Sequence, residues 1–270
     1  MSEIEFFKMS ASGNDFILID NRDRKVNKKY KDVAELVAKI CRRCHSVGAD
    51  GVILIERSTK ANFRWKFFNA DGSEAEMCGN GGRCAARFAF IKGITGNEMS
   101  FETIAGIIKA TVDGVNVKLQ LTTPFDIKLD YPINLEKNEI FLCSVNTGVP
   151  HAILLSDDID HVPVEELGRT IRYHKAFGEK GTNVDFVQIV DRGNILIRTY
   201  ERGVEGETYA CGTGAVAAGV ILVKKGLIES PVNIATRGGE TLKVYIDDEV
   251  YLEGNARIIY TGVLNDEATL

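Results

Sequence analysis

The sequence contains one glycine-rich cysteine motif twice, with an offset of 133 residues (211 − 78). The first copy begins Cys78-Gly79-Asn80-Gly81-Gly82 and ends Lys92-Gly93; the second begins Cys211-Gly212-Thr213-Gly214-Ala215 and ends Lys225-Gly226. Six of the sixteen aligned positions are identical, without a gap. The same offset relates Glu74 to Glu207, Thr103 to Thr236 and Gly106 to Gly239. Such a repeat predicts two homologous halves.

Each half is predicted to be an α+β domain built around the helix that begins at its cysteine motif. Residues 215–223 are nine consecutive apolar or glycine residues, and a helix that is apolar on all sides is a buried one. Gly93 and Gly226 stand where helices commonly end. Short segments rich in β-branched and aromatic residues flank both motifs and predict strands. We therefore expect two pseudo-symmetric domains, each a many-stranded, mostly antiparallel sheet wrapped around a central helix.

The expected domain boundary follows Leu121, because Pro124 begins a mixed segment with no clear period. The first domain is expected to comprise residues 1–121 with about 262–270, and the second residues 122–261.

Composition narrows the class of protein. Of 270 residues, 44% are hydrophobic and 26% are charged, and no apolar stretch approaches the roughly 18 residues that span a bilayer. A net charge of −5 without a long basic run argues against a nucleic-acid partner and favours a small molecule. The N-terminal segment carries acids where a secretory signal carries bases, so the expected location is the cytoplasm, where the six cysteines are reduced.

A cysteine at the start of a buried helix is placed for chemistry. The first backbone N–H groups of a helix have no partner within it, and the helix dipole adds partial positive charge there. Both features favour anions, including a thiolate or a substrate carboxylate. Lowering a thiol pKa from about 8.5 to about 6.5 would raise its ionised fraction at neutral pH from ~3% to ~75%. The glycines of both motifs would let a ligand approach the backbone.

Two such cysteines suggest a two-base reaction. If they face one carbon from opposite sides, one removes its proton and the other returns a proton to the opposite face, which inverts the centre. Backbone N–H groups would stabilise the negative charge that develops. Neither a metal nor pyridoxal phosphate is then required. The alternative is that Cys78 and Cys211 are small buried packing residues, but the matched glycine loops favour a chemical role.

The sequence resembles the diaminopimelate epimerase family over most of its length. Seven ordered blocks carry the resemblance: residues 7–16, Gly48-Ala49-Asp50-Gly51, residues 68–73, residues 77–84, Gly148-Val149-Pro150-His151, residues 182–186 and residues 200–214. The resemblance implies a cofactor-independent epimerase that interconverts LL- and meso-diaminopimelate for lysine and peptidoglycan synthesis. It also implies two pseudo-symmetric domains with a cleft between them.

Site residues follow from the same resemblance. Cys78 and Cys211 match the catalytic acid/base pair. Substrate recognition maps onto Asn14, Asn69, Asn183, Glu201 and Arg202, and the backbone of Gly79, Asn80, Gly212 and Thr213 would hold the reacting carboxylate. His151 and Glu201 match positions that tune the cysteines. The residue types suit these roles, since Arg202 can bind a carboxylate bidentately and Glu201 can pair with an ammonium.

Other interpretations stay open on sequence. Val149 stands where many family members have asparagine, so no substrate contact is expected from it. Proline-racemase-like and phenazine-type isomerases share the architecture, although proline racemases carry His at the position of Asn80. A two-domain amino-acid-binding protein is a non-catalytic alternative, and a homodimer is left open. Cys41-Arg42-Arg43-Cys44-His45 has the form of a haem or half-zinc motif, but no second ligand pair accompanies it, so we expect no metal.

Overall fold

The computed structural model describes residues 3–135 and 138–270. The chain divides into two compact units. Unit 1 runs to Leu119 and resumes from Gly254 to Leu270, and unit 2 comprises Gln120–Glu253. Each unit combines a series of paired strands with a central helix, which confirms the predicted fold class. No helix within the described ranges is long and apolar enough to span a bilayer.

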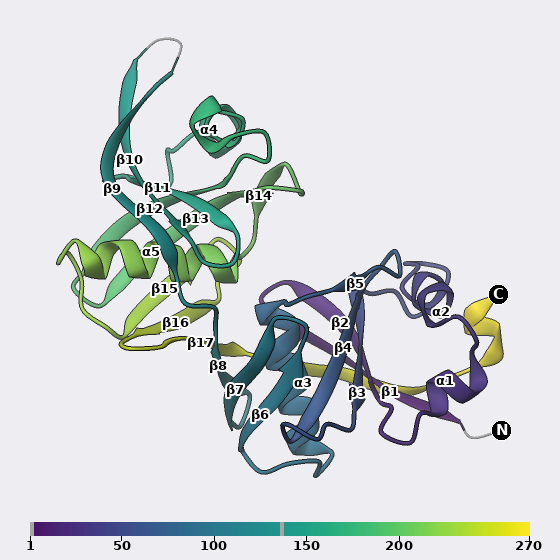
Figure 1. The fold of residues 1–270 in the computed structure, drawn as a ribbon. Coiled ribbons are helices and arrows are strands. Elements are labelled where there is room, and N and C mark those ends of the chain that lie inside the picture. Colours follow the sequence, from purple (N-terminus) through teal and green to yellow (C-terminus); the bar gives the residue numbers. More distant parts are fainter. Residues whose placement is uncertain (1–2, 136–137) are drawn as a thin grey trace. The chain divides into compact units, whose positions relative to one another are not determined.

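The described residues of unit 1 form short strands in mixed orientation and helices α1 to α3 (Figure 1). Its elements are β1 (Ile4–Ala11), β2 (Asn14–Asp20), α1 (Lys25–Lys29), α2 (Val33–Ile40), β3 (Gly51–Glu56), β4 (Phe63–Asn69), β5 (Glu74–Ala75), α3 (Gly79–Ile91), β6 (Glu98–Thr103), β7 (Gly106–Asp113), β8 (Asn116–Gln120), β18 (Arg257–Leu264) and the 3₁₀ turn η2 (Asp266–Thr269). The pairing order is β18-β1-β2-β3-β4-β6-β7-β8, with β5 on β4.

Unit 2 is built in the same way. Its elements are β9 (Phe125–Asn134), β10 (Glu139–Asn146), β11 (Pro150–Leu155), α4 (Val164–Arg172), the 3₁₀ turn η1 (Lys175–Phe177), β12 (Asn183–Asp191), β13 (Asn194–Glu201), β14 (Gly206–Thr208), α5 (Gly212–Lys224), β15 (Val232–Thr236), β16 (Thr241–Ile246) and β17 (Val250–Asn255). The pairing order is β9-β10-β11-β12-β13-β15-β16-β17, with β14 on β13.

The two pairing orders superpose element by element, which confirms the duplication predicted from the cysteine motifs. In unit 1 strand β2 is parallel to β3, and in unit 2 the equivalent strands β11 and β12 are also parallel. The fourth strand is parallel to the strand that follows the central helix, as β4 with β6 and β13 with β15. A parallel pair needs a crossover, and each of these crossovers contains a helix. The cysteine helices are therefore crossover helices of the fold.

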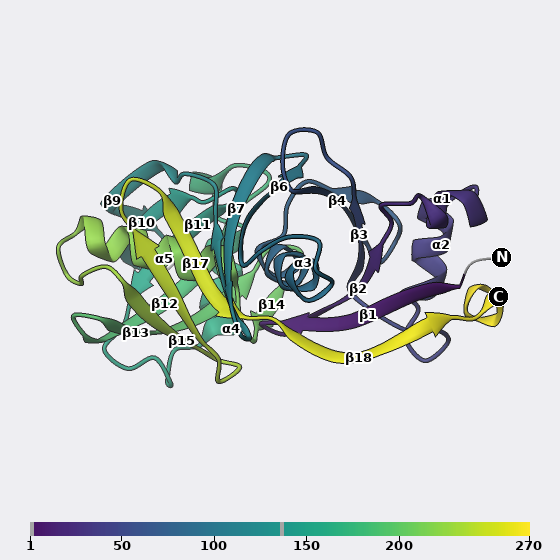
Figure 2. The same ribbon diagram turned by 90° about the horizontal axis from the view of Figure 1, so that it is seen from below.

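Both cysteine helices are buried, as their composition predicts. Figure 2 views α3 along its axis with strands of unit 1 around it, and α3 contacts β1, β2, β3 and β7. Every residue of α5 from Gly214 to Leu222 is buried. Gly93 and Gly226 follow the last turns with φ of 64° and 69°, the left-handed conformation that favours glycine. Each buried helix thus begins after the cysteine of its motif and ends before the glycine that closes it.

Two strands extend the sheets beyond the segments that the sequence predicts. β9 occupies the segment interpreted as a domain join, and its side chains are mostly exposed, so it lacks an alternating apolar pattern. β18 pairs along its length with β1, which assigns residues 257–261 to unit 1. β9 lies on β10 as β18 lies on β1, so each is the outer strand of its repeat.

Candidate functional site

Cys78 is the N-cap residue of α3. Its backbone is extended, with φ −146° and ψ 119°, and its Sγ accepts a hydrogen bond from the backbone N–H of Gly81 at 3.4 Å. This is the position at which an N-cap side chain normally satisfies one of the free N–H groups of the first turn. The sulfur therefore lies at the positive end of a buried helix, as the motif predicts.

Cys211 occupies the same position on α5, but its sulfur has different neighbours. It is the N-cap residue with an extended backbone, and its side chain makes no capping bond. The Sγ instead lies 3.4 Å from the hydroxyl oxygen of Thr213. Its side chain is 7% exposed, so the thiol is almost removed from solvent.

Burial raises the pKa of the Cys211 thiol, and the negative charges of Glu201 and Asp185 raise it further. The first turn of α5 lowers it by less. The expectation that the helix start would give a lowered pKa is therefore wrong for Cys211, because desolvation outweighs the effect of the helix end. Cys211 is thus a thiol and can donate a proton.

Three glycines of the two motifs are closely packed within their own units. A Cβ at Gly82 would lie 2.8 Å from a methyl carbon of Leu119, and one at Gly81 would lie 3.2 Å from Ile53. A Cβ at Gly214 would lie only 2.3 Å from Oδ1 of Asp185. A side chain at Gly214 would therefore meet the Asp185 carboxylate, whereas at Gly81 and Gly82 it would meet the ends of flexible side chains.

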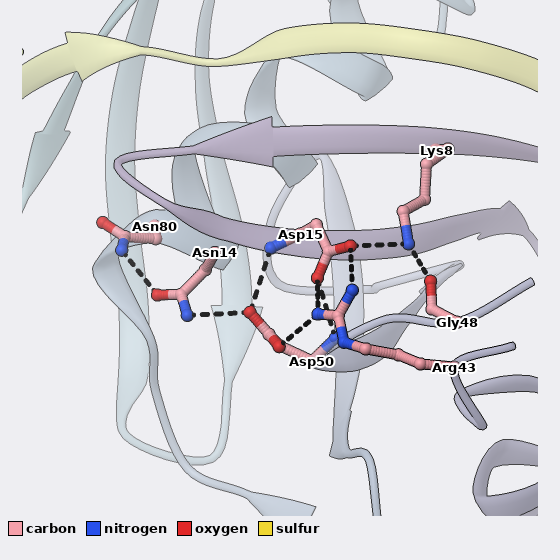
Figure 3. A network of polar contacts seen from close by, with 7 residues as sticks. All are labelled: Lys8, Asn14, Asp15, Arg43, Gly48, Asp50 and Asn80. Carbon is pink, nitrogen blue, oxygen red and sulfur yellow. Dashed lines mark hydrogen bonds and ion pairs between the residues drawn. The ribbon is translucent and has the colours of Figure 1, made fainter. Parts of the chain in front are cut away.

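In unit 1 a chain of amide hydrogen bonds joins the start of β2 to the start of α3 (Figure 3). Asn80 donates from Nδ2 to Oδ1 of Asn14 at 2.7 Å, and Asn14 donates from Nδ2 to Oδ2 of Asp50 at 2.9 Å. Arg83, fully buried in α3, donates from Nη2 to Oδ1 of Asn80 and to the hydroxyl of Ser12. Both ends of the Asn14 amide are thus oriented by the protein.

An ion network supports Asp50 from the other side (Figure 3). Arg43 donates to Oδ1 of Asp50 at 2.7 Å and to both carboxylate oxygens of Asp15. The nearly buried Lys8 bonds to Asp15 and to the carbonyl of Gly48. Although burial alone would raise the pKa of Asp15, the hydrogen bonds from Arg43 and Lys8 hold it below its usual value. The network therefore keeps the Asp15 carboxylate ionised next to Asn14.

The segment Cys41-Arg42-Arg43-Cys44-His45 contributes Arg43 to this ion network. Of its two cysteines, Cys41 is buried and Cys44 is exposed. Burial raises the pKa of the Cys41 thiol to about 12. No group of three or more potential metal ligands occurs among the described residues. Cys84 in α3 and Cys143 in β10 are buried thiols.

In unit 2 a hydrogen-bonded series leads from a buried carboxylate to Cys211. His151 and Asp185 are fully buried, and His151 Nδ1 lies 2.7 Å from Oδ2 of Asp185. Thr199 donates to the other oxygen of Asp185 at 2.7 Å. His151 Nε2 lies 3.0 Å from the hydroxyl of Thr213, which contacts the Cys211 sulfur. Asp185 was not singled out from the sequence, although a charged residue within the apolar run of β12 is a signal of a buried partner.

The remaining expected residues of unit 2 lie at the ends of neighbouring strands. The side chain of Asn183, 4% exposed, accepts from the backbone N–H of Arg202 and donates to the carbonyl of Pro150. It therefore fixes the backbone beside Arg202. Burial raises the pKa of the Glu201 carboxyl.

Two polar residues near the expected site have local partners. Asn69, at the end of β4 in unit 1, is exposed and donates to the hydroxyl of Ser73 at 3.0 Å. Asn146 accepts from the backbone N–H of Gly148, so its amide oxygen serves the turn before Val149.

Comparisons with known proteins agree with the resemblance. The family model for diaminopimelate epimerase matches residues 6–124 and 143–259. The diaminopimelate epimerase of Aquifex aeolicus is 46% identical over 98% of this chain and 99% of its own length. That of a Hydrogenobaculum species is 51% identical over 96% of this chain and 98% of its own length.

Solved structures share the fold at low identity. A Bacillus anthracis phenazine biosynthesis protein of the PhzF family has a TM-score of 0.72 at 16% identity and covers 98% of this chain and all of its own. A probable proline racemase from Agrobacterium radiobacter has a TM-score of 0.69, also at 16% identity, covering 98% of this chain and 95% of its own. The family match and the long, highly identical relatives decide between the isomerase alternatives: this chain belongs to the diaminopimelate epimerase family.

Proposed function

We propose that this chain interconverts LL- and meso-diaminopimelate by inverting one α-carbon. The observation that carries the proposal is the family match along both halves, together with a cysteine at the N-cap of the buried helix in each half. A packing role would not require the same thiol at both helix starts. Full-length relatives named diaminopimelate epimerase make this substrate the first choice.

The proposed reaction uses Cys78 and Cys211 on opposite faces of the substrate. One sulfur, as a thiolate, removes the α-proton, and the other, as a thiol, delivers a proton to the far face. The backbone N–H groups of Gly79, Asn80, Gly212 and Thr213 would hold the α-carboxylate and stabilise the charge that moves into it, a kind of interaction whose loss typically costs ~10²–10³ in rate. The buried thiol of Cys211, with its raised pKa, suits the donor role in the unliganded enzyme.

Recognition of the second amino-acid group would fall to the polar residues around these helix starts. Arg202 suits the distal carboxylate, while Glu201 and the amides of Asn14, Asn69 and Asn183 suit the ammonium groups. His151 would act through Thr213 on Cys211, by the contacts at 3.0 and 3.4 Å. The reaction as proposed uses no metal or organic cofactor. A cytoplasmic location, a homodimer and a role in lysine and peptidoglycan precursor synthesis complete the proposal.

Turnover of LL-diaminopimelate in deuterium oxide tests it. Early in the reaction, deuterium should enter the inverted product and not the recovered substrate, because a different group handles each proton. Proline serves as the control substrate and should not exchange. Cys78→Ala and Cys211→Ala should each abolish inversion. Binding of diaminopimelate without exchange at its α-carbon would instead support an amino-acid-binding protein, and exchange of proline would support a racemase of that class.

A further inference from the structure

The hydrogen-bonded series of unit 2, which runs from Asp185 through His151 and Thr213 to Cys211, determines which group is the donor in each hydrogen bond. Asp185 accepts from Thr199 through Oδ1 and contacts Nδ1 of His151 through Oδ2. An ionised carboxylate can only accept, so the proton of this contact lies on Nδ1. With a neutral imidazole, Nε2 is then bare and can only accept, and its neighbour at 3.0 Å is the Thr213 hydroxyl.

The same count of donors and acceptors places the proton of the Thr213 hydroxyl. A hydroxyl has a single proton, and Thr213 uses it toward His151 Nε2. Toward the Cys211 sulfur, 3.4 Å away, the Thr213 oxygen can therefore only accept. The partner must be an S–H group, so the series has its full set of hydrogen bonds only when Cys211 is protonated. A thiolate at Cys211 would require Thr213 to turn its proton to the sulfur and to leave Nε2 of His151 without a donor.

We infer that Asp185 is a positioning residue that, by fixing the tautomer of His151, makes Cys211 the proton-bearing member of the pair in the resting enzyme. The inference rests on the proposed role of Cys211. It adds a residue that touches neither the sulfur nor the site of the substrate, and acts through His151 and Thr213.

Two features of the surroundings support a fixed orientation of the Asp185 carboxyl group. Its carboxylate lies against the first turn of α5, where a Cβ at Gly214 would be 2.3 Å from Oδ1, so it lies at the positive end of that helix. His151 and Asp185 have no exposed surface, so solvent does not compete for their hydrogen bonds. The charged groups that act on the Cys211 sulfur are Glu201 and Asp185, which both disfavour its thiolate.

The tautomer of His151 can be measured directly in the full-length wild-type protein by ¹⁵N-detected imidazole NMR. The chain has four histidines, and the signals of His151 are identified as those that disappear in His151→Gln while those of His45, His161 and His174 remain. We expect a proton on Nδ1 and a bare Nε2. A proton on Nε2 at neutral pH, in either a neutral or a charged ring, would overturn the inference.

The effect on Cys211 is tested by alkylation with iodoacetamide as a function of pH, with each cysteine followed by peptide mass spectrometry. Asp185→Asn, which keeps the shape of the side chain, should move the midpoint for Cys211 down by at least one pH unit, a tenfold change in its ionisation constant. The exposed Cys44 is the internal reference and should not move.

A simple loss of charge at Asp185 would also lower this midpoint, so the contribution of the relay needs its own control. In a Thr213→Val background, where the hydroxyl is absent, the shift caused by Asp185→Asn should fall to less than half. In a Thr213→Ser background it should persist. An equal shift in all three backgrounds would show that Asp185 acts by charge alone and would overturn the relay.

The chain also offers a matched pair outside the site. Asp158 and His161 form a second His–Asp contact at 2.7 Å, but both side chains are largely exposed. Asp158→Asn should leave the Cys211 midpoint unchanged. None of these measurements depends on turnover, so loss of the proposed epimerase activity and failure of the relay would be told apart.

Discussion

Asn80, in the first turn of α3, donates a hydrogen bond to Oδ1 of Asn14 at the start of β2, over 2.7 Å. The other end of the Asn14 amide donates to Asp50. The amide of Asn14 is thereby oriented before any ligand arrives, with its oxygen toward α3 and its nitrogen toward Asp50 (Figure 3). Preorganisation of this kind lowers the cost of binding.

Asp50→Ala should therefore weaken substrate binding more than it slows turnover. Hydrogen bonds to charged groups contribute roughly 1.5–3 kcal/mol, and losing the acceptor of Asn14 should raise KM about tenfold with a smaller change in kcat. Asp20→Ala is the matched control, because Asp20 lies at the end of β2, the strand that begins with Asn14, and pairs with Arg22 instead. Steady-state kinetics with LL-diaminopimelate measures both. An unchanged KM in Asp50→Ala would show that Asn14 keeps its orientation without Asp50.

Cys78 has a structural role that can be separated from its proposed chemical one. Its sulfur caps Gly81, so Cys78→Ala should lower the free energy of unfolding by about 0.5–2 kcal/mol, whereas Cys78→Ser should recover part of that loss because a hydroxyl oxygen also caps. Both variants should lack epimerase activity. Chemical denaturation and the exchange assay give the two readouts. Equal stability of the alanine and serine variants would contradict the capping role.

Two glycines of α5 should respond differently to alanine. Gly214→Ala would bring a Cβ within 2.3 Å of Asp185, and overpacking typically costs 1–3 kcal/mol. At Gly219 the nearest atom is the flexible Cδ1 of Ile246 at 3.1 Å, and the gain in helix propensity of about 1 kcal/mol offsets the displacement. Urea unfolding should show a clear loss for Gly214→Ala and stability near wild type for Gly219→Ala. The reverse order would contradict the packing described for Asp185.

Stability should fall at alkaline pH because of the buried thiols. Burial raises the pKa of Cys84 to about 12, whereas an unfolded thiol titrates near 8.5. Between these values the unfolded chain loses protons that the folded one keeps, so each such thiol lowers the free energy of unfolding by up to about 1.4 kcal/mol per pH unit as pH rises. Below about pH 8.5 its contribution is constant. Denaturation of Cys84→Ala across this range should show a shallower slope than wild type, and an identical slope would contradict the assignment.

The repeat made much of the fold predictable. The buried helices, their C-terminal glycines and most strands follow from apolar composition and periodicity, and the offset of 133 residues predicts their duplication. β9 was missed because its exposed side chains and Pro132 give no strand period. The pairing of β18 with β1 joins distant segments, and no local pattern carries such information.

The hydrogen-bond partners of the expected site residues were harder to predict from the sequence. Arg43 was noticed only as part of a cysteine pattern, yet its hydrogen bonds go to Asp15 and Asp50. The pKa of Cys211 depends on how deeply the thiol is buried, which outweighs the helix end and cannot be obtained from the motif. Sequence gives the residue types at such a site, while the balance between desolvation and hydrogen bonding depends on the packed structure.

The pairing of β18 with β1 has a consequence for biosynthesis. Unit 2 is continuous in the chain, whereas the sheet of unit 1 takes its outer strand from residues 257–264. A ribosome therefore releases every strand of the second half before the first half can be completed. During translation, residues 4–11 emerge early with one edge uncovered, and that edge stays open until residues 257–264 have been made. Because β1 and β18 lie at opposite ends of this sequence, the open edge of β1 must be protected from aggregation during synthesis.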